Sequence, residues 1–558
     1  MLLSMSMNCR KRRLGESMPK VTKDSTNGKA LAPTGPRTPQ GMQFRSSPAA
    51  ESNPAGSHGS HKNDDFLKEL LKEIELWHTE EGVTYASIIK NGHTEHWPTK
   101  SKAFRQWVAK SYYDATGKLL ANQSLNDFLF ALEGKGLHDG PQYSLYIRVA
   151  EHDGSIYIDL CDESWRMVKI DKKGWRIVNS GPVRFRRAKG MLPIPAPVHG
   201  GNINELFNFV NVTQPDRVLI SCWLVDTLRA NHPHPILKFL GEQGSGKSTD
   251  AKVLRALADP NKALTRSAPR NEQDLAIAAH NGWIISLDNL SYVSPEKSDS
   301  LCRVSTGAGF AARTLYSDDE ETIISVQRPI ILNGIEDIGT RSDLLDREII
   351  IEVPNLKDRK SEGLFWKQFE EARPRILGAL LTAASSALNR LPGVQKYKRD
   401  LPRMADFAQW SIAAETALGF KAGTFLEAYN ANRTAANHTV LESSTVVCAI
   451  LDMFASTVGV KTPAIKEWKG TATDLIREIS VGQDIKAKGW PKSAKVLSGM
   501  LRRLAPNFRQ EGIEIEQVSE GTGDDKRKVW KITNKKPPKK KSLQSCDPID
   551  PATQTLDL

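Results

Sequence analysis

The strongest constraint on the fold is a short glycine-rich segment in the middle of the chain, Gly-Glu-Gln-Gly-Ser-Gly-Lys-Ser-Thr at residues 241–249. An apolar run from His234 to Leu240 precedes it, and a helical pattern from Ser248 to Ala258 follows. Glycines let backbone N–H groups wrap an anion, and the start of a helix adds partial positive charge there. Strand, glycine loop and helix in this order predict a phosphate-binding loop in an α/β sheet.

The residue types in this loop indicate ATP with Mg²⁺ as the ligand. Lys247 is expected to reach the β- and γ-phosphates, and the Ser248 hydroxyl to coordinate the metal ion. A chance glycine-rich turn is the alternative, but it does not account for the full motif with its flanks. The remaining positions that line the predicted cofactor site are Gly241, Gln243, Gly244, Ser245, Gly246 and Thr249.

Two later apolar segments end in polar residues that suit the same site. Residues 282–288 read as a strand whose last carboxylate, Asp288, would lie beside the Mg²⁺ held by Ser248. Residues 328–333 read as another strand, and its Asn333 would bond to the γ-phosphate or to the attacking water. A capping aspartate and a turn-forming asparagine are the structural alternatives.

Two arginines after the Asn333 strand are candidate arginine fingers. Arg341 or Arg347 could stabilise charge on the γ-phosphate of a neighbouring subunit. For each of them, a surface ion pair with a nearby acid (Asp343, Asp346 or Glu348) is an equally good interpretation.

The ordered set of motifs resembles the superfamily 3 helicases, and more closely the poxvirus-type primase-helicase ATPases of phages and integrative elements. The likeness covers about residues 205–355. It rests on the glycine loop, on Asp288-Asn289, on the segment Leu-Cys-Arg-Val-Ser-Thr-Gly-Ala-Gly-Phe-Ala-Ala-Arg-Thr-Leu-Tyr at 301–316, and on the strand that ends in Asn333. The resemblance implies an AAA+-like homo-hexamer in which an arginine finger is supplied in trans.

The same resemblance implies that a loop near residues 305–319 enters a central channel and touches single-stranded DNA, with Arg303 and Arg313 as candidate phosphate contacts. The sequence departs from the family pattern at two places. The tip of that loop, residues 317–321, is Ser-Asp-Asp-Glu-Glu and therefore acidic. Asn289 stands where related motors carry the glutamate that polarises water, so another acid has that role or hydrolysis is slow. The candidate acids are Glu272, Asp274, Asp318, Asp319, Glu320 and Glu321.

Composition and periodicity divide the chain around an α/β core, which the glycine loop marks as a P-loop NTPase and which the resemblance implies is of the AAA+ type. Within 63–200 we expect a helix through Phe66 and Trp77, a loop at His93 and His96, and a small antiparallel sheet over 143–187, where polar and apolar residues alternate. The expected regions are a disordered basic tail (1–62), an α+β accessory domain (63–200), the P-loop ATPase core (201–356), a helical lid (357–436), a winged-helix-like domain (437–534) and a disordered Lys-rich tail (535–558).

The winged-helix prediction rests on a helix that starts near Pro491 and on two strands joined by the turn at 521–525. The helix has apolar residues on one face and basic residues on the other, a pattern typical of a helix that enters a groove of duplex DNA. A protein-interaction module is the alternative. The candidate DNA contacts are Lys492, Lys495, Arg502, Arg503, Lys526, Arg527 and Lys528.

Charge and cysteine usage narrow the functional classes. A formal net charge of +12 favours a polyanionic partner. The six cysteines form no C-x-x-C pair, which argues against a zinc ribbon or a disulfide framework and suits a reducing cytoplasm. No run of about 18 apolar residues occurs, so no membrane span is expected. Residues 64–200 lack a convincing pair of catalytic carboxylates, so a built-in primase is not expected.

These features predict an ATP-dependent, helicase-like motor for DNA replication of a phage or mobile element. It would bind single-stranded DNA in a ring and duplex DNA at the winged helix, with a primase or polymerase as a candidate partner. A non-translocating ATPase switch that assembles or loads replication proteins is the first alternative. The second is a DNA-binding regulator in which ATP has only a structural role.

Overall fold

The structure is a computed structural model of the chain. It describes residues 57–290, 292–307, 309–313, 321–324, 326–334, 342–356, 358–396, 401–442, 444–454, 466–481, 483–485, 490–521 and 527–535. The chain divides into two compact units, residues 1–61 and 62–558, and almost all described residues belong to the second. Several predicted site residues lie outside the described residues: Arg341, Lys526, Asp318, Asp319 and Glu320.

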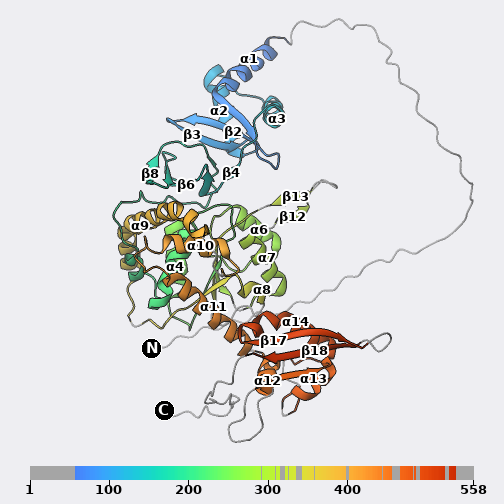
Figure 1. Ribbon diagram of the computed structural model, residues 1–558. Helices are drawn as coiled ribbons and strands as arrows, with labels where there is room; N and C mark the ends of the chain where they lie inside the picture. The colour runs from blue at the N-terminus through green and yellow to red at the C-terminus, as the bar shows by residue number, and fades with distance from the viewer. Residues whose placement is uncertain are drawn as a thin grey trace, which may run out of the picture. The chain divides into compact units, whose positions relative to one another are not determined.

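The first region after residue 57 contains three helices and a three-stranded antiparallel sheet in the order β1-β2-β3 (Figure 1). Its elements are α1 (Ser57–Glu73), β1 (Ile74–His78), β2 (Thr84–Lys90), β3 (His93–Pro98), α2 (Lys102–Thr116) and α3 (Asn122–His138). The prediction of one helix through Trp77 was wrong, as was the loop at His93 and His96, which lie in β3. The spacing of Leu70, Ile74 and Trp77 suits a helix, but Trp77 stacks on Tyr85 of β2 at 4.8 Å, and this tertiary contact favours the strand.

Residues 145–185 form the predicted small sheet. Four strands pair antiparallel in the order β5-β6-β7-β8. This confirms the sheet that was predicted from the alternation of polar and apolar residues. Asp153 and Gly154 both have positive φ, as a two-residue hairpin turn requires. The strands are β4 (Leu145–Tyr146), β5 (Val149–His152), β6 (Ser155–Asp159), β7 (Met167–Asp171), β8 (Gly174–Val178) and β9 (Arg184–Phe185).

A parallel four-stranded sheet in the order β11-β14-β10-β15 occupies the centre of the sequence. Its strands are nearly continuous apolar runs because both faces are buried. Its strands and the elements between them are η1 (Ile203–Asn208), α4 (Gln214–Asp226), β10 (Ile236–Leu240), α5 (Lys247–Ala258), α6 (Glu272–His280), β11 (Ile285–Leu290), α7 (Pro295–Thr306), β12 (Phe310–Arg313), β13 (Glu321–Ile324), β14 (Ile330–Gly334), α8 (Ser342–Leu345) and β15 (Glu348–Glu352).

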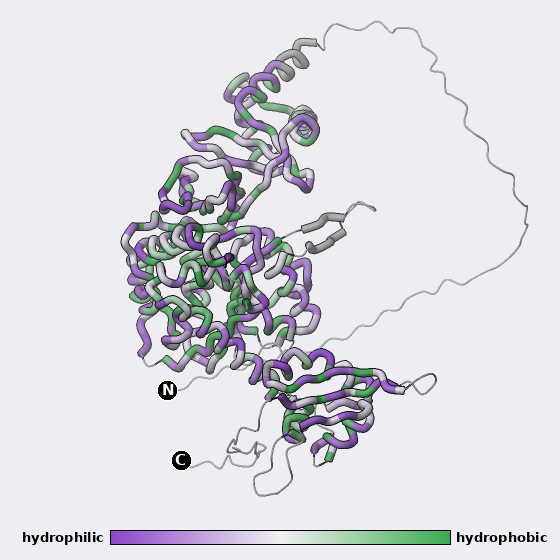
Figure 2. Tube along the Cα trace, viewed as in Figure 1, coloured by the Kyte–Doolittle hydropathy of each residue, from purple (hydrophilic) through white to green (hydrophobic). Residues whose placement is uncertain are grey.

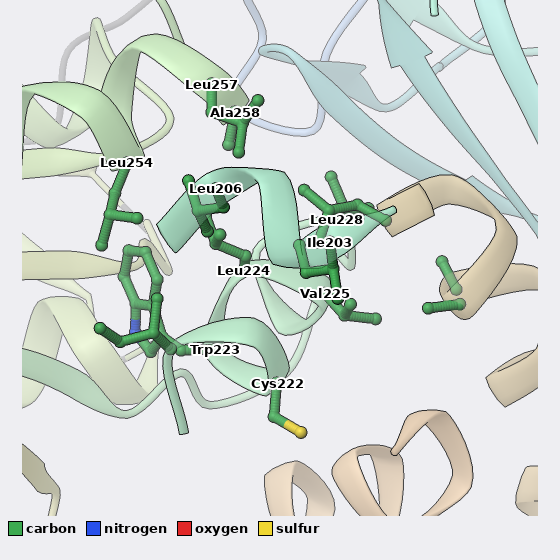
Figure 3. Packing of buried hydrophobic residues seen from close by; sticks show 14 of the residues in the cluster. Ile203, Leu206, Cys222, Trp223, Leu224, Val225, Leu228, Leu254, Leu257 and Ala258 are labelled. Atoms are coloured by element: carbon green, nitrogen blue, oxygen red, sulfur yellow. The ribbon is translucent and has the colours of Figure 1, made fainter. Parts of the chain in front are cut away.

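Three helices follow this sheet: α9 (Glu362–Lys396), α10 (Ala405–Ala414) and α11 (Thr424–Glu442). One cluster of buried apolar side chains draws members from β5–β8, from η1, α4, β10 and α5, and from α9–α11. Figure 3 shows part of this cluster, with Leu206 of η1, Trp223 of α4 and Leu254 of α5 gathered together. The apolar core therefore runs across the boundaries expected at residues 200 and 356.

A buried ion pair also crosses the first of these boundaries. Arg148, just before β5, donates from Nε to Asp259 Oδ1 at 3.0 Å, and neither side chain is exposed. Its two terminal nitrogens donate to the carbonyls of Asp159, Leu192 and Pro260. Asp259 Oδ2 in turn accepts the backbone N–H groups of residues 283 and 284, at 3.1 and 3.0 Å. This pair ties the accessory sheet to the end of α5 and to the residues that lead into β11.

The last region has its own cluster of buried apolar side chains. Its elements are α12 (Thr445–Phe454), β16 (Glu467–Gly470), α13 (Ala472–Ile479), α14 (Ala494–Gln510), β17 (Ile513–Glu520) and β18 (Arg527–Asn534). The strands pair antiparallel in the order β16-β18-β17, and hydrophilic and hydrophobic residues alternate along β17 and β18 (Figure 2). The sequence did not indicate β16, and the predicted helix starts at Ala494 rather than near Pro491, because Ser493 caps it.

Among the described residues, the helices are all too short or too polar to cross a bilayer.

Candidate nucleotide-binding site

The glycine loop (residues 241–246) connects the end of β10 directly to the first residue of α5. Gly241, Gly244 and Gly246 all have positive φ, of 147°, 84° and 99°. A Cβ on Gly241 would lie 2.7 Å from the carbonyl oxygen of Val353, so a larger residue does not fit there. The loop therefore curls at the carboxyl edge of a parallel sheet, in front of a helix N-terminus, where backbone N–H groups can bind an anion.

Lys247 is the first residue of α5, and its side chain folds back over the glycine loop. Its Nζ donates to the carbonyl oxygens of Gly241 at 2.7 Å and Glu242 at 2.6 Å. Burial lowers the pKa of Lys247, and the charge of Asp288 opposes this shift. Both acceptors are neutral carbonyls of the loop itself, so a phosphate at this position would be a stronger partner for the ammonium group.

Ser248, Asp288 and Asn333 come from three different elements and meet at one point. Ser248 Oγ donates to Asp288 Oδ1 at 3.0 Å. Asn333 Nδ2 lies 2.9 Å from Ser248 Oγ and 2.5 Å from Asp288 Oδ1. The structure thus brings together the predicted metal ligands and the predicted sensor residue. A hydroxyl and a carboxylate oxygen side by side are the ligand types that Mg²⁺ prefers.

Asn289 has a backbone conformation that explains its residue type. Its φ is +56°, and the pairing register between β11 and β14 shifts between Leu287 and Leu290, around this residue. Asparagine tolerates this left-handed region, whereas glutamate would cost about 1 kcal/mol there. The backbone N–H of Asn289 also donates to Asp288 Oδ1 at 2.9 Å. The asparagine that replaces the family's glutamate therefore lies at a local irregularity of β11. Its backbone N–H helps to orient the Asp288 carboxylate.

Asn211 is a functional candidate that sequence reasoning missed. Its side-chain amide donates to the carbonyl oxygens of Ser245 at 3.0 Å and Pro354 at 2.6 Å. Its backbone N–H donates to Asp250 Oδ1 at 3.0 Å, and burial raises the pKa of Asp250 well above its usual value. Asn211 therefore fastens the glycine loop to the chain after β15. No motif marks this residue, because it lies between η1 and α4, far from the loop in sequence.

The structure places Arg347, one of the two candidate arginine fingers, in contacts within its own chain. Its Nη1 donates to the carbonyl oxygen of Asp343 at 2.7 Å and pairs with the carboxylate of the same residue. Arg403 also bonds to Asp343, at 3.0 Å, and Arg433 pairs with Asp346. The ion-pair interpretation of Arg347 therefore holds in this chain. A contact with a neighbouring subunit would require this pair to open.

The predicted DNA contacts fall into two groups. In the first, Arg303 lies on α7 and pairs with Glu272 at 2.6 Å, and Arg313 ends β12, where its register partner is Glu321. In the second, the basic residues of the last region are all exposed: Lys492 before α14, Lys495, Arg502 and Arg503 on α14, and Arg527 and Lys528 at the start of β18. The second group is exposed, so a phosphate backbone could reach it directly.

One group of three potential metal ligands occurs among the described residues, and hydrogen bonding accounts for it. Asp226 at the end of α4 lies 2.8 Å from His232 Nε2 and 2.8 Å from His234 Nδ1. The other ring nitrogen of His232 faces the carbonyl oxygen of Ala230 at 3.2 Å. The two carboxylate oxygens of Asp226 are therefore each engaged by one of the two rings. We interpret the group as a buried acid–histidine triad held by hydrogen bonds, not as a metal site.

The acid–histidine triad predicts a loss of stability in mild acid. Burial is the main cause that lowers the pKa of His234 to about 4. The unfolded chain takes up this proton near pH 6.5, so the stabilisation is complete above pH 6.5 and is lost as pH falls towards 4. The contribution of His234 should therefore fall by about 2 kcal/mol between pH 6.5 and pH 5. Urea unfolding at both pH values measures it.

The control for this prediction is His234→Asn, which can still donate to Asp226 but does not titrate. His96 and His280 also have pKa values lowered to about 4, mainly by burial, and will keep part of the pH dependence in this variant. Asp226 does not add to the change in stability between pH 6.5 and pH 5. Burial raises its pKa, but the two histidines together lower it below its usual value. An equal pH slope in wild type and variant would contradict the prediction.

Solved structures of the C-terminal region of NrS-1 are similar to this chain at low identity. The apo C-terminal region of NrS-1 in its A form is 16% identical, with 84% of this chain and 98% of that chain covered and a TM-score of 0.38. A second apo structure of that region is 14% identical, with the same coverage and a TM-score of 0.36. These values are too low to inform the fold or the function. No curated protein matches the chain significantly.

Two family profiles match the sequence, one directly after the other. Residues 202–438 match the actinomycete integrative conjugative element replication protein, and residues 446–545 match the C-terminal domain of the same replication protein. The first match contains the glycine loop, Asp288 and Asn333, and the second contains α14 and the basic surface around it. Together they span more than half of the 558 residues. The chain therefore belongs to the replication proteins of actinomycete integrative conjugative elements.

Proposed function

We propose that this replication protein binds and hydrolyses ATP with Mg²⁺ and uses the energy as a helicase-like DNA motor. The observation that carries the proposal is the meeting of Lys247, Ser248, Asp288 and Asn333 beside the glycine loop. A P-loop NTPase core of the AAA+ type is the fold that fits this arrangement. The proposed assembly is a homo-hexamer in which Arg341 or Arg347 acts on the neighbouring site.

Each residue of the site has a role in this proposal. Lys247 exchanges the carbonyl oxygens of the glycine loop for the β- and γ-phosphates. Ser248 and Asp288 hold Mg²⁺, which neutralises charge on the phosphate oxygens when it is bound. Asn333 Nδ2, already aimed at this point, positions the γ-phosphate or the attacking water. Asn211 keeps the glycine loop in place during the exchange.

A non-translocating ATPase switch is the second candidate, and Asn289 favours it. The left-handed backbone at this position disfavours the glutamate that would polarise the attacking water. Slow hydrolysis suits a protein that assembles or loads others at a replication origin better than it suits a fast motor. In that case ATP binding itself, rather than repeated turnover, would drive the assembly.

The two candidates separate in one set of assays on the wild-type protein. ATP hydrolysis is measured with and without single-stranded DNA, followed by displacement of a labelled strand from a forked duplex. A motor should show DNA-stimulated hydrolysis together with strand displacement. Hydrolysis without displacement would place the switch first, and ATP binding without turnover would leave only a structural role for the nucleotide.

We further propose that the last region is a winged helix that binds duplex DNA. Its support is the exposed basic face of α14, which includes Arg502 and Arg503. Reversing both charges (Arg502→Glu, Arg503→Glu) should weaken duplex binding by at least about tenfold and flatten its salt dependence, since about two phosphate contacts are lost. Fluorescence anisotropy over a salt series measures both quantities.

Arg477→Glu is the matched control for the DNA prediction. Arg477 lies on α13 in the same region, is exposed, and pairs with Asp474 at 2.7 Å. Its reversal changes the net charge of the region without touching α14. The control reverses one charge and the α14 variant two, so a loss of binding free energy about half as large in the control would show a general charge effect. An unchanged α14 variant would favour a protein-interaction role.

A further inference from the structure

The chain that follows β15 lies against the glycine loop at each of its three glycines. Val353 O is 2.7 Å from the point where a Cβ on Gly241 would lie. Leu356 Cδ1 is 3.4 Å from the corresponding point on Gly246, and Arg359 Nη2 is 3.4 Å from that on Gly244. The family motif accounts for the glycines as phosphate donors, but it does not account for a second segment that covers them.

Hydrogen bonds fix this segment in place. The Pro354 carbonyl accepts from the amide of Asn211 at 2.6 Å, and Asn355 Nδ2 donates to Glu242 Oε2 at 2.8 Å. Val353 also donates its backbone N–H to the carbonyl of Leu240 at 2.8 Å. This bond continues the pairing of β10 with β15 beyond the end of β15. The segment is therefore attached both to the strand that enters the loop and to the loop itself.

Among the described residues of this segment, Arg359 is the one that carries an exposed cation next to the loop. Its Nη2 is the one described atom, apart from those of Gly244 and its chain neighbours, that lies within 4 Å of the point where a Cβ on Gly244 would be. Within the described part of the chain it has no hydrogen bond and no ion pair, although Asp358 is its neighbour. An arginine held beside a phosphate loop, with its five donors unused, suits a phosphate oxygen in both charge and geometry.

We infer that Arg359 binds the phosphate chain of the nucleotide from within the same subunit, and that residues 353–356 together with Arg359 form one wall of the site. The inference rests on the proposed ATP site and adds to it a contact that the motif does not contain. This contact differs from an arginine finger, because Arg359 belongs to the chain whose glycine loop holds the nucleotide. Binding of ATP would therefore also fix the connection between β15 and α9.

The test compares the affinity for Mg·ATP of wild type, Arg359→Gln and Arg359→Lys by isothermal titration calorimetry. Loss of a charge-assisted hydrogen bond to phosphate should weaken binding by roughly tenfold or more in Arg359→Gln. Arg359→Lys should recover part of the affinity, because lysine keeps the charge but offers no planar pair of donors. Arg359 is exposed, so the thermal midpoint without nucleotide should stay unchanged in both variants.

Lys360→Gln is the matched control, since it removes one positive charge from the next exposed residue, for which the structure gives no loop contact. An unchanged affinity in Arg359→Gln, or an equal loss in Lys360→Gln, would overturn the inference. Failure of the proposed function looks different: the wild type itself would then bind no ATP, or would bind it equally well after Lys247→Ala.

Discussion

Replacing Lys247 with alanine is expected to reduce ATP turnover by at least about 100-fold, since a preorganised positive charge at the phosphates is lost. The structure gives a second reason for a large effect. Nζ of Lys247 also bonds to the carbonyls of Gly241 and Glu242, so its removal frees the loop that should wrap the phosphates. Steady-state hydrolysis with and without single-stranded DNA measures the loss, and calorimetry shows whether binding fails as well.

The control for this variant is Lys252→Ala, which removes a lysine from the same helix one turn further on. Its turnover should remain close to that of the wild type. If Lys247→Ala keeps normal hydrolysis, the glycine loop is not a phosphate site and the proposed function is wrong. If binding persists and only turnover is lost, Lys247 acts mainly on charge that develops during the reaction.

The second large effect concerns folding rather than chemistry. Asp259→Ala is expected to lower the free energy of unfolding by about 3–5 kcal/mol, the usual cost of leaving a buried charge without its partner. Arg148 would keep its charge without the carboxylate that pairs with it, and the N–H groups of Trp283 and Ile284 would lose their acceptor. Urea unfolding followed by tryptophan fluorescence measures the change, because Trp283 lies at the site.

A double-mutant cycle separates the ion pair from the other bonds of Arg148. Arg148→Met together with Asp259→Ala should cost clearly less than the sum of the single variants, because the unpaired charge is gone. Some loss will remain in the double variant, since Arg148 also donates to three carbonyls and has a positive φ of 65°. A change of less than about 1 kcal/mol in Asp259→Ala would mean that water replaces the carboxylate.

The sequence predicted the candidate site better than the rest of the structure, for a physical reason. Parallel strands place their carboxyl ends at one edge, so Asp288 and Asn333 meet Ser248 once the order of the strands is right. Local patterns also identified the hairpins over 149–178. Asn211, residues 353–356 and Arg359 could not be predicted, because their contacts with the loop join segments that share no local signal.

Other misses have the same origin in tertiary contacts. Trp77 belongs to a strand because Tyr85 stacks on it, although its spacing suits a helix. β16 is a four-residue strand that exists through its pairing with β18, and its own residues, Glu-Trp-Lys-Gly, carry no strand pattern. The sequence shows only that Asn289 replaces a glutamate, and it gives no sign of the left-handed backbone conformation at this position. The irregular strand pairing that favours asparagine is visible only when β11 lies beside β14.

The ion pair between Arg148 and Asp259 limits how such genes can recombine. Mobile elements exchange segments of coding sequence, and a crossover near codon 200 would join one protein's Arg148 to another protein's α5. Unless the new partner also carried an aspartate at the end of that helix, the hybrid would bury an unpaired charge. A crossover between Tyr429 and Leu441 would instead leave both apolar clusters whole. Exchange of C-terminal regions between elements should therefore be tolerated far better than exchange of accessory sheets.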